Sequence, residues 1–137
     1  MYLVDTSVWI HALRPSGNSV IQSLLKPIIV EGDAAVTEWI LLELMTGLRT
    51  AEGKDDLLDR FSPVTRLPFE PPWWERSWAL AARLRKHGVS ANAADCFIAT
   101  VAKEHHVPLI HCDADFEDMK THAGLETVDW TVHLTKR

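Results

Sequence analysis

The feature that most constrains the fold is the alternation of short strand-like segments with longer segments of helical pattern. Five segments have the length and composition of strands, namely residues 2–4, 34–37, 64–67, 109–112 and 127–130. Helical segments separate them along the whole chain. Strands that alternate with helices predict an α/β layer fold with a mainly parallel sheet.

The predicted helices cover residues 8–13, 19–25, 38–49, 57–61, 73–87 and 93–106, and a short helix begins near Phe116. Ser7 can cap the first of them, and Pro27 is expected to end the second. Asn92 and Asp95 have the spacing of a capping pair at the start of the helix over 93–106.

Length and composition are those of an ordinary globular protein. The 137 residues, 47% hydrophobic and 24% charged, suit a single domain over 1–137. No apolar run approaches the ~20 residues that cross a bilayer, and the N-terminus lacks the basic region of a signal peptide. Cys96 and Cys112 form no CxxC motif and are expected to be buried, reduced thiols. We therefore expect a cytoplasmic protein without a membrane segment.

The charge balance limits the possible nucleic-acid partners. The net charge of −5 argues against a simple nucleic-acid clamp, which would carry a basic excess. Basic residues are uneven, with a local run at 83–87. An acidic chain with local basic positions is expected where carboxylates are gathered for a purpose, and it also arises by chance.

Four acids occupy positions that are unusual for surface carboxylates. Asp5 and Asp113 each follow a predicted strand directly, and ligands bind beyond the carboxyl ends of parallel strands. Glu43 and Asp95 lie on helical faces made of apolar or small residues. A buried, unpaired carboxylate costs several kcal/mol or becomes protonated. These acids therefore need either exposure or a partner.

Each acid also has a simpler interpretation. Asp95 can be an acid in the first turn of a helix, which the helix dipole favours by ~0.3–1 kcal/mol. Glu43 can be an exposed edge residue or an ion-pair partner of Arg14 or Arg49. The pattern of all four is harder to dismiss, because a hard divalent cation stabilises several converging carboxylates.

Oxygen ligands without histidine or cysteine select Mg²⁺ or Mn²⁺ over zinc. In the stretch 109-LIHCDADFEDM-119, Asp113 and Asp115 are the acids expected to face such an ion. Glu117 and Asp118 are expected to cap the following helix or to face water.

At four places in the same order the chain resembles the PIN domains of VapC-type toxins from toxin–antitoxin pairs. The matching segments are 3-LVDTSVWI-10, 38-EWILLELMTGLR-49, 95-DCFIATVA-102 and 109-LIHCDADFEDM-119. The resemblance implies a three-layer α/β/α sandwich and a Mg²⁺- or Mn²⁺-dependent endoribonuclease. It also implies an RNA substrate, silencing by a cognate VapB-like antitoxin, and a homodimer.

The resemblance further implies roles for individual residues. Asp5, Glu43, Asp95 and Asp113 match the acidic quartet that would hold the ion and its activated water. Asp115 matches an additional acid found in many relatives. The hydroxyls of Thr6 and Ser7 match a position that supports the first acid, and Thr6 is also a candidate for substrate binding. Arg14 could reach an RNA phosphate, or it could be a solvated surface arginine.

Two other classes compete with the nuclease. A receiver-like signalling module would also use an acidic Mg²⁺ pocket, but it needs paired acids after the first strand, where only Asp5 stands. A PIN-like domain that has lost catalysis is the other alternative, and the intact quartet argues against it. A zinc site built on His105, His106, His111 and Cys112 fits no closed tetrahedral spacing.

The tryptophans of the helix over 73–87 allow a prediction about packing. Trp74 and Trp78 share a helical face, which predicts that they pack in the core. Trp73 is the better candidate for an exposed or interface position.

Overall fold

The sheet at the centre of the molecule is entirely parallel. The computed structural model describes residues 1–48 and 51–134. Its five strands are β1 (Tyr2–Val4), β2 (Ala34–Val36), β3 (Thr65–Arg66), β4 (Leu109–His111) and β5 (Thr127–Asp129). They pair in the order β3-β2-β1-β4-β5, and every pair is parallel. The predicted α/β fold with a mainly parallel sheet is confirmed.

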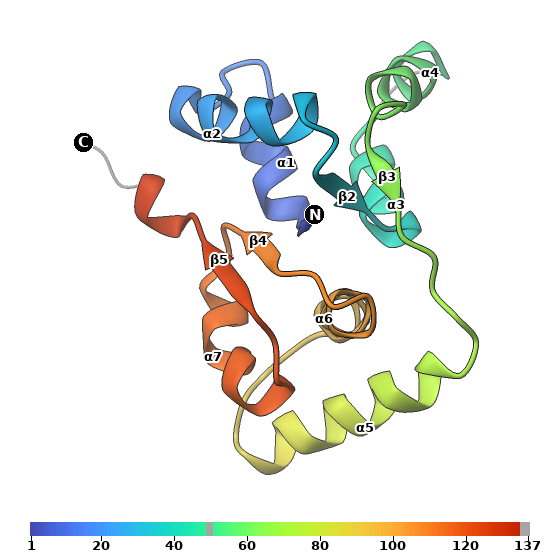
Figure 1. Cartoon of the computed structure of the whole chain (residues 1–137), viewed down its shortest axis with the longest axis vertical. Coiled ribbons are helices and arrows are strands. Elements are labelled where there is room, and N and C mark those ends of the chain that lie inside the picture. Colours follow the sequence, from blue (N-terminus) through green and yellow to red (C-terminus); the bar gives the residue numbers. More distant parts are fainter. Residues whose placement is uncertain (49–50, 135–137) are drawn as a thin grey trace.

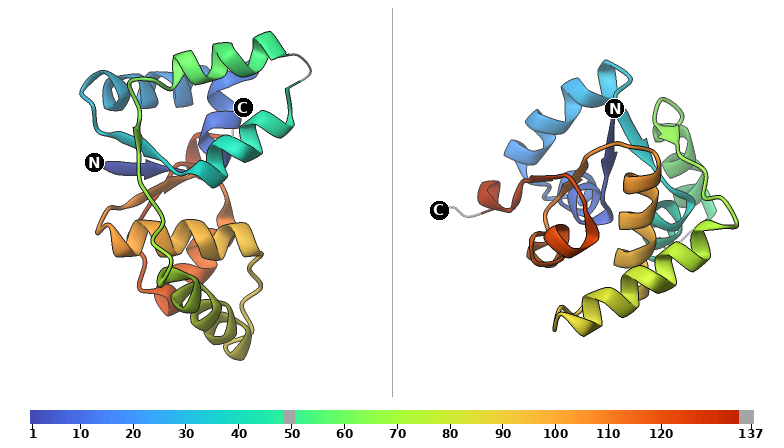
Figure 2. Two further views of the ribbon diagram at one scale, coloured as in Figure 1. Left: turned by 90° about the vertical axis from the view of Figure 1, so that its right-hand side faces the viewer. Right: turned by 60° about the horizontal axis from the view of Figure 1, so that its bottom comes forward.

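Helices cover both faces of this sheet. They are α1 (Thr6–Leu13), α2 (Ser19–Val30), α3 (Glu38–Thr46), α4 (Ala51–Arg60), α5 (Trp73–Lys86), α6 (Ala93–Glu104) and α7 (Ala114–Ala123), followed by the 3₁₀ turn η1 (Thr131–His133). In Figure 1 the chain runs from β1 near the centre to η1 at the edge. The left view of Figure 2 shows α1 to α4 on one side of the strands and α5 to α7 on the other. This arrangement is the predicted three-layer sandwich.

Burial explains why the central strands are almost entirely apolar. Leu3 and Val4 of β1 and Leu109 of β4 have no exposed surface, because helices cover the sheet on both faces. The edge strand β3 instead carries the exposed Thr65 and Arg66. Polar, short edge strands limit pairing with another chain.

Several helix boundaries differ from the predictions, most of all that of α4, which begins at Ala51 and not near residue 57. Helix α1 begins at Thr6 with Asp5 as its N-cap, so Ser7 lies inside the helix and does not cap it. Helix α2 continues past Pro27 to Val30. A proline inside a helix costs about 3 kcal/mol, but Ile28 and Ile29 beyond it still pack against the core, which offsets that cost.

The C-terminal helices show smaller differences. Helix α7 begins at Ala114, two residues earlier than predicted, because Asp113 caps it. Asn92 caps α6 as predicted, with its side chain accepting from the backbone N–H of Asp95. Arg49 lies outside the described residues, and α3 ends at Thr46.

The prediction for the tryptophans is wrong. Trp74 and Trp78 are 43% and 65% exposed, whereas Trp73 is partly buried. The buried face of α5 is formed by other residues, including Ser77, whose hydroxyl donates to Thr100 of α6 at 2.8 Å. This hydrogen bond lies between α5 and α6. The rings of Trp74 and Trp78 lie on the outer side of α5, where Trp74 packs on Phe69.

The strand order predicts a ligand-binding site at the carboxyl ends of the central strands. From β1 the chain first adds β2 and β3 on one side, and later adds β4 and β5 on the other. The carboxyl ends of β1 and β4 therefore flank the point where the winding reverses, which is where open α/β sheets bind ligands. No helix in the described ranges is long and apolar enough to span a membrane.

Candidate metal and RNA site

Asp5 leaves β1 at this reversal point and is almost fully buried. Its backbone N–H donates to the Ile110 carbonyl at 2.9 Å, which extends the β1–β4 pairing by one residue. Its carboxylate Oδ2 accepts from the Ser7 backbone N–H at 3.0 Å and from the Ser7 hydroxyl at 2.6 Å. The Ser7 hydroxyl in turn accepts from the Cys112 N–H at 2.9 Å. One serine thus ties the end of β1 to the end of β4.

Glu43 reaches the same region from α3. Its Oε1 accepts a hydrogen bond from the Thr6 hydroxyl at 2.8 Å, so it lies beside the first turn of α1. Burial raises the pKa of Glu43, the Thr6 hydrogen bond opposes that rise, and the charge of Asp5 adds to it. Thr6 therefore supports the second acid, whereas Ser7 supports the first. Both hydroxyls were predicted to support the first.

Asp95 lies in the first turn of α6, within electrostatic reach of Asp5 and Asp113, and is 8% exposed. Burial, together with repulsion from Asp113 and Asp5, raises its pKa from 3.8 to about 7. The helix dipole favours an acid in the first turn of α6, which was the simpler interpretation of Asp95. That benefit is too small to offset burial and repulsion, so the surroundings of Asp95 favour its neutral form.

Asp113 and Asp115 come from the turn between β4 and α7. Asp113 is the N-cap of α7, and its Oδ1 accepts from the Asp115 N–H at 3.0 Å. The Asp113 charge contributes to raising the pKa of Asp5, in which burial is the largest cause. Asp115 is exposed and contributes least to the raised pKa of Asp95. It lies at the margin of the group.

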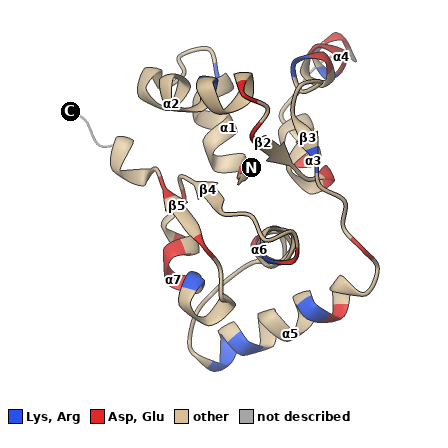
Figure 3. Cartoon of the chain, in the orientation of Figure 1, with Lys and Arg blue, Asp and Glu red and all other residues tan. Residues whose placement is uncertain are grey.

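No cation neutralises this group within the described part of the chain. The ion pairs there join Met1 to Asp33, Arg66 to Glu38, Arg76 to Glu104, and Glu117 to Lys120 and His111. Figure 3 shows basic residues spread over several helices, among them α4, α5 and α7. Buried like charges without a counter-ion raise each other's pKa, and a divalent cation would relieve that repulsion.

The carboxylates do not form a finished ligand shell. Among residues 1–48 and 51–134, no three His, Cys, Asp or Glu side chains are already arranged to hold a metal ion. The donor chemistry fits a hard cation, since the group consists of carboxylate oxygens from four different elements.

Arg14 does not join the acids. It follows the last residue of α1, at the opposite end of that helix from Asp5 and roughly 12 Å along its axis. It lines a groove of about 440 Å³ between α1, α3 and α4. Glu43 forms no ion pair with Arg14, so that alternative for Glu43 is not supported.

The sequence reasoning missed the role of His111 and Glu117. Glu117 neither caps α7 nor simply faces water, as had been predicted, because its Oε2 lies 2.6 Å from Nε2 of His111. His111 is completely buried in β4. A histidine in an otherwise apolar strand was the available signal, and it was weighed only as a zinc ligand. The two cysteines are free and buried, as predicted.

Comparison with known proteins identifies the class to which this fold and acid group belong. A family model described as PIN domain matches residues 2–121, and the chain belongs to the PIN domain family. Among curated proteins, it is similar to Ribonuclease VapC18 and Ribonuclease VapC21 of Mycobacterium tuberculosis, at 25% and 28% identity. The alignments cover 96% of this chain, and 96% and 94% of the two relatives. The predicted likeness to VapC-type proteins is confirmed.

Solved structures show the same fold. A chain in the crystal structure of VapBC2 from Rickettsia felis bound to promoter DNA superposes with a TM-score of 0.77 at 19% identity, covering 94% of this chain and 98% of that one. A chain in FitAcB from Neisseria gonorrhoeae gives 0.72 at 24% identity, covering 93% and 96%. At such identities the superpositions establish the architecture alone.

Proposed function

We propose that this protein is a metal-dependent endoribonuclease and the toxin of a type II toxin–antitoxin pair. The observation that carries the proposal is the group of Asp5, Glu43, Asp95 and Asp113 beyond the ends of β1 and β4. Burial, with added repulsion from neighbouring acids, raises the pKa values of Asp5, Glu43 and Asp95, and none of the four acids has a cation partner among the described residues. The relatives named Ribonuclease VapC supply the reaction class.

The four carboxylates would hold Mg²⁺ or Mn²⁺, with Asp115 as an outer participant. When bound, the ion would supply Lewis-acid charge to the phosphodiester and lower the pKa of water for attack. The chain's own residues set the geometry, since Ser7 holds the Asp5 carboxylate and Thr6 holds that of Glu43. Because Thr6 already donates to Glu43, its contribution to RNA binding would be indirect.

The partners follow from the same relatives. Structures similar to this chain include VapBC complexes, which supports a cognate VapB-like antitoxin as partner. The groove of about 440 Å³ between α1, α3 and α4 is lined by apolar residues such as Ile10, Leu13 and Leu44. Such a groove suits an amphipathic segment, in the helix-in-groove mode of recognition. A homodimer and a cytoplasmic location remain part of the proposal.

The proposal is tested by sequencing RNA ends after expression of wild type and of Asp5→Asn. The proposed chemistry predicts new 5′-phosphate ends at defined sites with the wild type and none with the variant. The main alternative is a PIN-like binding domain without catalysis. Identical RNA ends in both samples, with purified wild type also inactive in Mg²⁺ and Mn²⁺, would support that alternative.

A further inference from the structure

His111 contacts the candidate site without being one of its acids. It is the last residue of β4, its side chain has no exposed surface, and its ring packs against Phe116 with the centroids 5.3 Å apart. Its Nδ1 accepts a hydrogen bond from the backbone N–H of Asp113 at 3.2 Å. Its Nε2 lies 2.6 Å from Oε2 of Glu117. Both ring nitrogens are therefore engaged, which excludes the zinc role considered for this histidine.

The two contacts determine which nitrogen carries the proton. A backbone N–H only donates, so Nδ1 must present its lone pair to Asp113. The remaining proton is then on Nε2, where it is donated to the Glu117 carboxylate. This assignment is the one in which both hydrogen bonds form, and it requires no charge on the buried ring.

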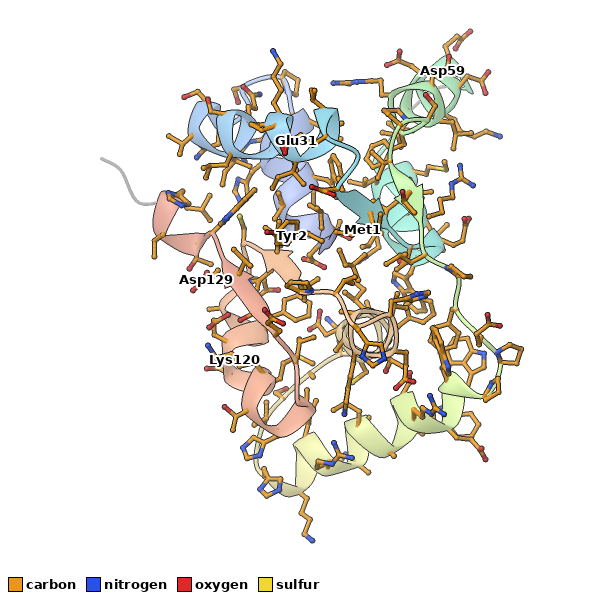
Figure 4. The ribbon with its side chains drawn as sticks, viewed as in Figure 1. Met1, Tyr2, Glu31, Asp59, Lys120 and Asp129 are labelled. Atoms are coloured by element: carbon orange, nitrogen blue, oxygen red, sulfur yellow. The ribbon has the colours of Figure 1, made fainter. Side chains whose placement is uncertain are left out.

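Glu117 is itself held by several donors. Its Oε2 also accepts from the Thr127 hydroxyl at 2.7 Å, and its Oε1 accepts from Nζ of Lys120 at 2.6 Å. Figure 4 shows Lys120 on α7 beside β5. The histidine is therefore linked through one carboxylate to both α7 and β5. A ring anchored at both nitrogens has little freedom to rotate.

The turn that carries Asp113 is consequently fixed from several directions. The Asp113 N–H is held by His111, and the preceding N–H of Cys112 is held by the Ser7 hydroxyl. The His111 carbonyl accepts from the Trp130 N–H at 2.9 Å. The Asp113 carboxylate is oriented by the Asp115 N–H. Two consecutive amides at the exit of β4 thus each have a side-chain acceptor.

From these contacts we infer that His111 is a positioning residue, which holds the Asp113 backbone so that its carboxylate faces Asp5 and Asp95. The inference rests on the proposed function, because it assigns to His111 an effect on divalent-ion binding. Outer partners of metal ligands typically change metal affinity by 10- to 100-fold when they are removed. A ring with no exposed surface that satisfies an amide of a candidate ligand is in such a position.

A matched pair of substitutions separates the two contacts. In His111→Asn the side-chain oxygen can take the place of Nδ1 and accept from the Asp113 N–H, but the contact to Glu117 is lost. In His111→Gln the longer amide can reach Glu117, and the Asp113 N–H loses its acceptor. Both variants replace a buried ring and are expected to lower the melting temperature. Met119→Ala, which truncates a fully buried side chain of α7, the helix that carries Glu117, is the control for that loss.

The first measurement is hydrogen exchange of the Asp113 amide in metal-free protein. We expect exchange near the wild-type rate in His111→Asn and clearly faster exchange in His111→Gln. The second is Mn²⁺ affinity by calorimetry, with an expected loss of about tenfold for His111→Gln and less than about threefold for His111→Asn. In RNA cleavage, His111→Gln should need more Mn²⁺ for half-maximal rate, with the KM for RNA unchanged.

The outcomes are distinguishable. If both variants and Met119→Ala lose Mn²⁺ affinity in proportion to their melting temperatures, His111 is only a structural residue and the inference is overturned. It is also overturned if His111→Gln binds Mn²⁺ like wild type. A wild-type protein that binds Mn²⁺ and cleaves RNA leaves the proposed function standing in either case. A wild-type protein that neither binds Mn²⁺ nor cleaves RNA overturns both.

Discussion

Two carboxylates, Glu117 of α7 and Asp95 of α6, differ in their hydrogen-bond partners and in the direction of their pKa shifts. Glu117 accepts hydrogen bonds from Lys120, Thr127 and His111, and these outweigh its partial burial and lower its pKa to about 2. Asp95 has no cation partner among the described residues, and burial and repulsion from Asp113 and Asp5 raise its pKa to about 7. One carboxylate stabilises the fold as an anion, and the other destabilises it.

The proposed function accounts for this difference, since it assigns Glu117 a structural role and the acids of the candidate site an ion-binding role. A carboxylate that is surrounded by donors has no need of another partner. Acids that are buried together, as Asp5 and Asp95 are, leave a negative site that a divalent ion can fill. Perturbed ionisation of this kind is concentrated at functional sites in proteins. Four experiments test this contrast between the two kinds of carboxylate.

The largest effect is expected on catalysis. Asp5→Asn and Asp95→Asn should each reduce RNA cleavage by about 10³-fold or more, which is ~4 kcal/mol in activation free energy. In chelator, both variants should unfold at the same denaturant concentration as wild type or a higher one, because repulsion is removed. Cleavage assays and urea unfolding in EDTA measure the two quantities. Asp118→Asn, the same change on an exposed residue of α7, is the control and should alter neither. Clear destabilisation of both site variants would contradict a repulsive pocket.

The next effect is stabilisation by metal. An ion that binds only the folded protein at 100 times its dissociation constant adds about 2.7 kcal/mol to the free energy of unfolding. We expect Mn²⁺ to raise the melting temperature of wild type and of Glu117→Gln, and to leave that of Asp5→Asn nearly unchanged. Differential scanning calorimetry with and without EDTA makes the comparison. An equal Mn²⁺ shift in Asp5→Asn would place the ion elsewhere.

A smaller effect is expected from pH in metal-free protein. Between about pH 4 and pH 7 the unfolded chain loses the Asp95 proton while the folded protein retains it, so stability falls as pH rises through this range. The loss for this group is on the order of 2 kcal/mol. Urea unfolding in EDTA at pH 5 and pH 8 should show it in wild type, and Asp95→Asn should show a flatter profile. An identical profile in both proteins would refute the raised pKa of Asp95.

The smallest effect is the pH dependence of stability that Glu117 contributes. It is opposite in direction to that of Asp95. The stabilisation by Glu117 is present above its ordinary pKa of 4.5 and is lost as pH falls toward about 2. Glu117→Gln should therefore cost on the order of 1 kcal/mol at pH 7, since the carboxylate is partly exposed to solvent, and less at pH 3. Urea unfolding at the two pH values measures the difference. A cost that is equal at pH 7 and pH 3 would mean that the charge of Glu117 is unimportant.

The alternation of strands and helices was sufficient to predict an α/β layer fold with a mainly parallel sheet, and it placed Asp5 and Asp113 directly after strands. Asp5 and Asp113 follow strands, and the carboxyl ends of β1 and β4 must meet if those strands are parallel neighbours. Glu43 and Asp95 were recognisable because their helical neighbours are apolar or small. These inferences depend on periodicity and chain order, which the sequence contains.

Other features depend on side-chain direction, which the sequence does not contain. The contact of Glu117 with Thr127 joins residues ten positions apart on α7 and β5. The exposure of Trp78 follows from which face of α5 is buried, and that face carries Leu80, Leu84 and Ser77, whose hydroxyl donates to Thr100 of α6. Pro27 lies within a helix because the residues after it are held by the core. In each case tertiary packing overrides a local preference.

The central claim is that the acids of β1, α3, α6 and the β4–α7 turn form one divalent-ion site. The most direct measurement is X-ray diffraction from crystals soaked in Mn²⁺, with data collected for anomalous scattering. The account predicts an anomalous peak bordered by the carboxylates of Asp5, Asp95 and Asp113, which is absent in Asp5→Asn crystals. Carboxylates that keep their separate positions, with no anomalous density among them at saturating Mn²⁺, would contradict it.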